Sequence, residues 1–175
     1  MSKKVSSLTI MGVLWGRLYY AFAKEIKDQL GEEDGKKLLI DCIKKYATIR
    51  GEAIAEYVQE QQLPYNAQSF VDNYDSCWSD LQNAFLELFP EKKLITAEGT
   101  TFCPFLELWR DLEDGKELCL IYCEEFHKAM WEAYHPDLRV RQDNIMARND
   151  DICTFETYME GEKDKVIQIF NQKVS

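Results

Sequence analysis

Apolar residues recur every three or four positions in the first part of the chain. Over residues 11–30 the repeat consists of Met11, Trp15, Leu18, Phe22, Ile26 and Leu30. This spacing is typical of one face of an α-helix, and Gly31 directly after it predicts where the helix ends. The pattern therefore predicts a helix with a single buried apolar stripe.

A second helix is expected from about residues 32–34 to residue 61 or 62, because Pro64 follows. Gly51 lies inside this helix and costs about 1 kcal/mol relative to Ala, so close packing or a bend is expected there. The predicted buried positions are Leu39, Ile43, Tyr46, Ala53 and Tyr57.

The pattern changes after Pro64. Residues 66–83 suit one or two short helices, whereas residues 84–89 fit a helix or a strand equally well. Residues 93–97 and 100–103 flank Glu98-Gly99, which predicts a hairpin, and a short helix follows from Phe105. A long helix is expected over residues 116–134, and a second hairpin pairs residues 138–147 with residues 152–159.

This order predicts an α+β fold with N-terminal helices, then an antiparallel sheet of two hairpins separated by a long helix. The 175 residues are expected to form a single domain. It comprises a helical half over about residues 1–83, a hairpin–helix–hairpin half over about residues 84–160, and a short C-terminal tail.

Charge and composition narrow the function. The net charge of −10 and pI near 4.8 disfavour binding to nucleic acid or to an anionic membrane. No secretory signal or membrane-spanning stretch is recognised, so a cytoplasmic location is expected. The six cysteines do not suggest a disulfide framework, and Cys42 and Cys119 are interpreted as small buried hydrophobes. No nucleotide or phosphate-binding motif is present, so no cofactor is expected.

Three short motifs carry a family resemblance. They are Cys103-Pro104-Phe105, Tyr122-Cys123, and the stretch from Arg141 to Phe155. Here the chain resembles the L-2-amino-thiazoline-4-carboxylic acid hydrolase family and, more distantly, small-molecule-binding domains of the 4-vinyl-reductase type. The resemblance implies an enclosed pocket for a small organic ligand and, for the hydrolases, opening of a thiazoline ring to N-carbamoyl-L-cysteine.

Four positions depart from the family motif, and at one of them Phe126 or His127 stands where the family usually has an Asp. Asn149 stands where the family prefers Gly, and Asn can still adopt a left-handed conformation. Asn144 replaces a Thr, and Thr154 replaces an Asp. These replacements favour the alternative that the chain binds a small molecule without catalysis.

The candidate site follows from the chemistry of ring opening. Water must reach the carbon between nitrogen and sulfur, the departing thiolate needs a proton, and the substrate carboxylate needs a cationic anchor. Arg141 matches the family arginine and is the candidate anchor. The alternative is a surface arginine paired with Asp143 or Glu156.

The candidate catalytic residues are a histidine and two cysteines. His127 is a candidate general base, the alternative being a core-edge histidine bonded to a neighbour. Cys103 just before a helix, and Cys123 one turn from His127, are candidate nucleophiles, with buried structural thiols as the alternative. The remaining residues proposed to contact the substrate are Tyr122, Trp109 and Asn144.

The leading hypothesis is a hydrolase that acts on a C–N or C–S bond of a small carboxylated heterocycle. Binding without catalysis is the alternative. A Cys₃His metal site built from Cys103, Cys123, His127 and Cys153 is a weaker option, because their spacing lacks a Cys-x-x-Cys or His-x-x-x-His pair, and no metal is assigned. The expected partner is a small molecule, and a homodimer is left open.

Overall fold

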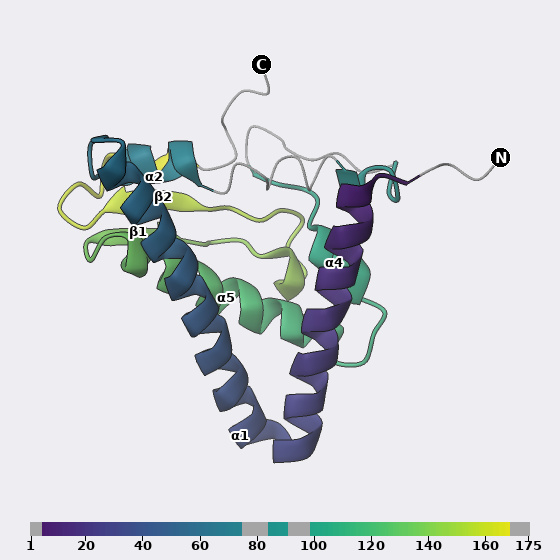
Figure 1. Ribbon diagram of the computed structural model, residues 1–175. Coiled ribbons are helices and arrows are strands. Elements are labelled where there is room, and N and C mark those ends of the chain that lie inside the picture. The colour runs from purple at the N-terminus through teal and green to yellow at the C-terminus, as the bar shows by residue number, and fades with distance from the viewer. Residues whose placement is uncertain (1–4, 75–83, 91–98, 169–175) are drawn as a thin grey trace.

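The computed structural model describes residues 5–74, 84–90 and 99–168 (Figure 1). The fold is mostly helical with a small antiparallel sheet. Its elements are α1 Ser7–Glu60, α2 Ala67–Asn73, α4 Pro104–Trp109, α5 Gly115–Tyr134, β1 Leu138–Arg141, the 3₁₀ helix η1 Met146–Arg148, β2 Glu156–Met159 and β3 Ile167–Gln168.

α1 is bent into two arms that form a V in Figure 1. It begins at Ser6, whose side chain accepts a hydrogen bond from the Thr9 amide at 3.2 Å. Gly31 interrupts it with φ +79° and ψ 177°, a conformation that glycine adopts without penalty. The two helices predicted on either side of Gly31 are therefore confirmed, as the arms over residues 7–30 and 32–60.

The burial predicted for the first arm is wrong. Met11, Leu18 and Phe22 are 62%, 52% and 62% exposed, and Leu30 is also exposed. The residues that face the body are instead small ones, namely Thr9, Gly12, Gly16 and Ala23. A Cβ on Gly16 would lie only 2.8 Å from the Leu108 side chain, so the arm packs closely through its small residues.

The second arm packs against α5, as Figure 1 shows. Leu39 and Ile43 are buried as predicted, whereas Tyr46, Ala53 and Tyr57 are exposed. The close packing expected at Gly51 is confirmed, because a Cβ there would lie 2.3 Å from the Met130 carbonyl oxygen.

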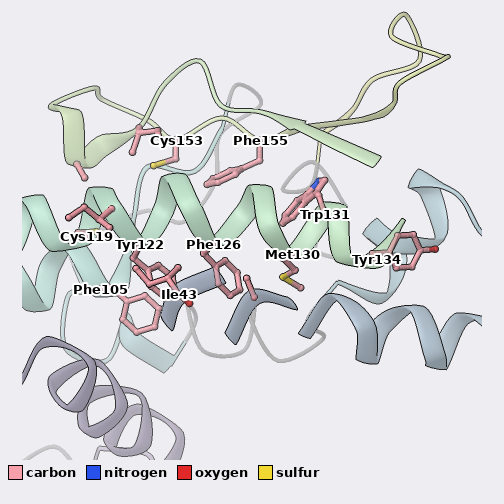
Figure 2. Packing of buried hydrophobic residues seen from close by; sticks show 14 of the residues in the cluster. Ile43, Phe105, Cys119, Tyr122, Phe126, Met130, Trp131, Tyr134, Cys153 and Phe155 are labelled. Carbon is pink, nitrogen blue, oxygen red and sulfur yellow. The ribbon is translucent and has the colours of Figure 1, made fainter. Parts of the chain in front are cut away.

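α5 is the central element of the core. Figure 2 shows it between the chain that carries Cys153 and Phe155 on one side and the elements that carry Ile43 and Phe105 on the other. Trp131 Nε1 donates a hydrogen bond to Thr157 Oγ1 at 3.0 Å, which ties α5 to β2. This long helix was predicted over residues 116–134, and it begins one residue earlier.

The sheet is smaller than predicted. β1 and β2 pair antiparallel, with Leu138 opposite Met159 and Arg141 opposite Glu156. Their strands are short because residues 142–155 form a wide connection that contains η1. Asn149 there has φ +78°, which confirms the expected left-handed residue. β3 adds to the other edge of β2, so the tail returns to the sheet.

The expectation of two hairpins separated by a long helix is not met. Within the described residues there is one hairpin, and α5 precedes it. Thr100 forms an isolated antiparallel bridge with Cys153. Residues 93–97, the other half of the expected pair, lie outside the described residues.

Two smaller predictions can be compared with the structure. α2 is one of the short helices expected over residues 66–83, and residues 75–83 lie outside the described residues. Residues 84–88 form a helical turn and no strand. Across the described residues, every helix is too short or too polar to cross a lipid bilayer.

Candidate active site

A small cavity of about 50 Å³ lies in the core beside α5. It collects side chains from α1, α4, α5 and the connection before β2, which are far apart in the sequence. The lining residues are Arg50, Tyr74, Thr100, Phe102, Cys103, Phe105, Cys119, Tyr122, Cys123, Phe126, His127, Cys153 and Phe155. Most of this wall is apolar, so polar groups in it interact with little screening by solvent.

His127 is buried and lines the cavity. Its Nδ1 lies 2.6 Å from the Cys123 carbonyl oxygen, so Nδ1 carries the proton and donates this hydrogen bond. The neutral ring therefore has its lone pair on Nε2. Burial lowers the pKa of His127 to about 4, although the Cys123 carbonyl raises it and the Arg50 charge lowers it further. At neutral pH the ring is an uncharged base.

Cys103 is the cavity thiol with the lowered pKa. The Cys119 thiol donates a hydrogen bond to its sulfur, which is the main cause of the lowering, and burial opposes it. The amide of Leu106 also donates to the sulfur at 3.5 Å, because Cys103 caps α4. The same thiol pair raises the pKa of Cys119 well above its usual value, so Cys119 stays protonated as the donor.

Cys123 and Cys153 complete a group of four cysteines on the cavity wall. Cys123 is half-buried on α5, one turn before His127, as the sequence spacing predicted. Cys153 is buried, and its sulfur accepts a hydrogen bond from the Met146 amide at 3.2 Å. Burial raises the pKa of Cys153, which makes it a poor nucleophile and a good packing residue.

Arg50 is the cation on the cavity wall, and sequence reasoning missed it. Its guanidinium lies 5.2 Å from the centre of the Phe126 ring and 5.5 Å from that of Tyr46, and it donates to the Tyr46 hydroxyl at 3.2 Å. An arginine can stack on aromatic rings, and its planar guanidinium matches the geometry of a carboxylate. The available signal was a charge beside Gly51, where α1 approaches α5 most closely.

Arg141 is placed elsewhere. Its side chain is 53% exposed on β1, pairs with Glu156, and lies 3.4 Å from Asp143 Oδ2. It is not among the residues that line the cavity. This is the surface pairing that the sequence analysis set against an anchoring role.

Of the other three candidate binding residues, one lines the cavity and two do not. Tyr122 is buried and lines the cavity, where its ring stacks on Phe126 at 4.9 Å. Trp109 is buried outside the cavity lining and donates from Nε1 to the Gly16 carbonyl at 2.9 Å. Asn144 lies in the connection after β1, where its backbone N–H donates a hydrogen bond to Thr154 Oγ1 at 3.1 Å. Neither Trp109 nor Asn144 reaches the cavity wall.

A metal centre has no support in the part of the chain that the structure describes. There, no three or more His, Cys, Asp or Glu side chains have an arrangement that could hold an ion. Although the thiols and His127 share one cavity, they do not form a ligand set.

Comparison with known proteins identifies a family. No curated protein and no solved structure gives a significant match. The sequence model of a family described as L-2-amino-thiazoline-4-carboxylic acid hydrolase matches residues 13–157. That range includes α1 from residue 13 onward, the whole of α5 and every residue of the cavity wall. The chain therefore belongs to the L-2-amino-thiazoline-4-carboxylic acid hydrolase family, whose reaction is the hydrolytic ring opening of an aminothiazoline carboxylate.

Proposed function

We propose that this chain opens the ring of a small 2-amino-thiazoline carboxylate inside the cavity, by addition of water and cleavage of the C–S bond. The observation that carries the proposal is the shared placement of a neutral, oriented histidine and an aromatic-stacked arginine on one apolar wall. The histidine can take a proton from water, and the arginine can bind a carboxylate.

Arg50 is proposed to hold the substrate carboxylate. A guanidinium binds a carboxylate through two parallel hydrogen bonds, and such charge-assisted bonds are strong where solvent is excluded. Arg50 is half-buried on the cavity wall, whereas Arg141 is exposed on β1 and does not line the cavity. The anchoring role first expected of Arg141 is therefore assigned to Arg50.

His127 is proposed to act as general base and then as general acid. Nε2 takes one proton from water as the water oxygen bonds to the ring carbon between nitrogen and sulfur, and the C=N double bond becomes a single bond. The remaining hydroxyl proton passes to the ring nitrogen as the carbonyl forms. When the C–S bond breaks, the thiolate sulfur takes that proton back from Nε2. Because the pKa of His127 is about 4, its protonated form is a strong acid toward a thiolate, whose usual pKa is about 8.5. The product is an N-carbamoyl amino acid with a free thiol.

Cys103 supplies a second route to the same product. Its sulfur would attack the ring carbon and expel the substrate thiolate, and water would then release the product from the enzyme. Replacement by Ala separates the two routes, because the water route tolerates loss of the thiol and the covalent route does not. We assign the water route, since His127 is uncharged and oriented without any partner being displaced.

The cavity must widen before it accepts a substrate. At about 50 Å³ it holds a few water molecules, and ligand pockets usually reach several hundred Å³. Arg50 is a long side chain between two rings, so its rotation is the simplest way to enlarge the space. Substrate binding is thus expected to be accompanied by a movement of Arg50.

The test compares two arginines of the same chain. The wild-type protein is incubated with 2-amino-thiazoline-4-carboxylate, and the carbamoyl product is followed by chromatography with mass detection. Arg50→Gln is expected to raise KM by roughly 10- to 100-fold, the cost of about 1.5–3 kcal/mol for hydrogen bonds to a charged group. Arg141→Gln is the matched control, with no more than a few-fold change. A larger increase in KM for Arg141→Gln than for Arg50→Gln would show that Arg141 binds the carboxylate.

Binding without turnover is the second candidate function. Asn144 and Thr154 are two positions at which the chain departs from the family motif. Both form hydrogen bonds to each other within the hairpin connection, and this observation favours binding without turnover. In that case the thiazoline raises the melting temperature and no carbamoyl product forms. Product formation decides for the hydrolase.

A further inference from the structure

The first arm of α1 exposes its large apolar residues to solvent. Eleven of the fifteen exposed large hydrophobic side chains in the described residues lie on α1. Met11, Leu18 and Phe22 recur at spacings of seven and four residues, on the stripe that also carries Trp15 and Ile26. A stripe of this period is the pattern of a helix face that packs against another helix.

The exposed stripe forms one wall of a groove between the two arms. The groove encloses about 440 Å³, and Leu39, Ile43 and Tyr46 of the second arm form its other wall. Glu25 is the one charged residue among the groove-lining residues. Both walls are helices, so the groove suits an apolar helix placed along it.

The arm cannot turn this stripe inward. Its inner face consists of the small residues Gly12, Gly16 and Ala23, and Gly16 is already in close contact with Leu108 and Phe105 of α4. Large side chains on that face would push the arm off the body. The apolar stripe is therefore available to a partner outside the chain's own core.

The two arms of α1 differ in net charge. The first arm, residues 7–30, carries three basic residues (Arg17, Lys24 and Lys27) and two acidic ones (Glu25 and Asp28), a net charge of +1, although the whole chain has a net charge of −10. Residues 32–60 carry seven acidic and five basic residues, a net charge of −2. Arg17 is exposed and makes no ion pair with the described residues, and Asp41 on the second arm is likewise exposed and without an ion pair there. The first arm of one molecule is therefore complementary in charge to the second arm of another.

The area is sufficient. The first arm has seven exposed large hydrophobic side chains. Side chains of this size that are about half exposed each leave on the order of 100 Å² uncovered, so burying them covers roughly 700 Å² per molecule, close to the value of a standard interface. Residues 7–30 span about 36 Å as a helix.

We propose that two copies of this chain pair about a two-fold axis, each placing the arm of residues 7–30 into the groove between the arms of the other. The interface is isologous, so the same stripe is buried twice. Met11, Leu18 and Phe22 form its apolar centre. Arg17 faces the acidic second arm of the partner, and Cys42, exposed in the groove, becomes covered.

The experiment measures molar mass by sedimentation equilibrium from nanomolar to high micromolar protein. The wild-type chain is expected to be a dimer at micromolar concentration. The double variant Leu18→Glu and Phe22→Glu is expected to weaken association at least 100-fold, with unchanged helical circular dichroism. Leu112→Glu is the matched control, because Leu112 is an exposed leucine outside α1, and this variant stays dimeric.

A second measurement needs no variant. Alkylation of Cys42 by a bulky maleimide, located by peptide mapping, is expected to be at least tenfold slower in the dimer than after dilution to the monomer. A chain that is monomeric at every protein concentration tested overturns the proposal. It does so even if a hydrophobic dye or lipid vesicles bind in the groove. A dimer that survives the double variant, or whose Cys42 reacts at one rate throughout, overturns it as well.

Discussion

Gly51 is the position where one added methyl group tests both the packing and the site. It lies where α1 meets α5, and a Cβ there would be 2.3 Å from the Met130 carbonyl oxygen and 2.8 Å from the Ala133 Cβ. Both distances are shorter than van der Waals contact. Neither neighbour can rotate away, since one is helix backbone and the other is a side chain without a rotatable bond.

The magnitude of Gly51→Ala follows from two opposing effects. Overpacking typically costs about 1–3 kcal/mol, and the two rigid neighbours place Gly51→Ala in the upper part of that range, at about 2–3 kcal/mol. The better helix propensity of Ala returns about 1 kcal/mol. The net expectation is a loss of about 1–2 kcal/mol, which lowers the melting temperature by roughly 2–8 °C in a chain of this size. Because Arg50 is the adjacent residue and moves with α1, KM should rise as well.

The assay is thermal unfolding followed by circular dichroism, together with the kinetics of ring opening. Gly161→Ala is the control, because a Cβ there meets nothing within 4 Å and no positive φ is recorded. Its melting temperature should stay within about 2 °C of the wild-type value, since surface substitutions typically change stability by less than about 0.5 kcal/mol. A Gly51→Ala protein as stable as this control would refute the close approach of the two helices.

Two further predictions concern ionisable groups in the cavity. Burial lowers the pKa of His127 from 6.5 to about 4, so the unfolded chain binds more protons in this window and stability falls as pH decreases, by roughly 1.4 kcal/mol per pH unit. Urea unfolding at several pH values checks this, and His127→Asn should flatten the slope; an unchanged slope in that variant would assign it to other groups. Cys103 should react with iodoacetamide at lower pH than Cys119 and Cys153, because its pKa is lowered and theirs are raised. Peptide mapping that finds Cys119 or Cys153 labelled first would contradict the proposed thiol pair.

Helix positions were predictable because they depend on local signals. Gly31 and Pro136 bound helices as their backbone chemistry requires, and the spacing of Cys123 and His127 placed both on one wall of the cavity. Along residues 152–157 buried positions alternate with half-buried ones, and Cys153, Phe155 and Thr157 are the buried ones. Periods of 3.6 and 2 are properties of the backbone, so they can be recognised in a single sequence.

The burial of the first arm could not be predicted from its period. A helical stripe of large apolar residues shows that one face differs from the other, but not which face meets the body. Here Gly12 and Gly16 allow α1 to approach α4 closely, and the larger face is left outside. Close packing through small residues contributes to stability without a large hydrophobic side chain to reveal it.

The site was predicted in part for a similar reason. His127, Cys103, Cys123 and Tyr122 line one cavity, whereas Arg141 pairs with carboxylates on the sheet. Arg50 and Cys119 join the cavity only because α1 crosses α5 at Gly51 and Cys119 lies one turn before Cys123. A contact between residues 50 and 127 depends on this crossing, which no local pattern specifies.

The central claim, that His127 is the base for ring opening in this cavity, is tested most directly by kcat of the His127→Asn variant. Asn retains a donor near the position of Nδ1 for the Cys123 carbonyl and removes the lone pair at Nε2. General base catalysis typically contributes about 10²- to 10⁴-fold, so kcat for 2-amino-thiazoline-4-carboxylate should fall by at least about 100-fold in a protein that remains folded. A folded variant that forms the carbamoyl product at the wild-type rate would contradict the account.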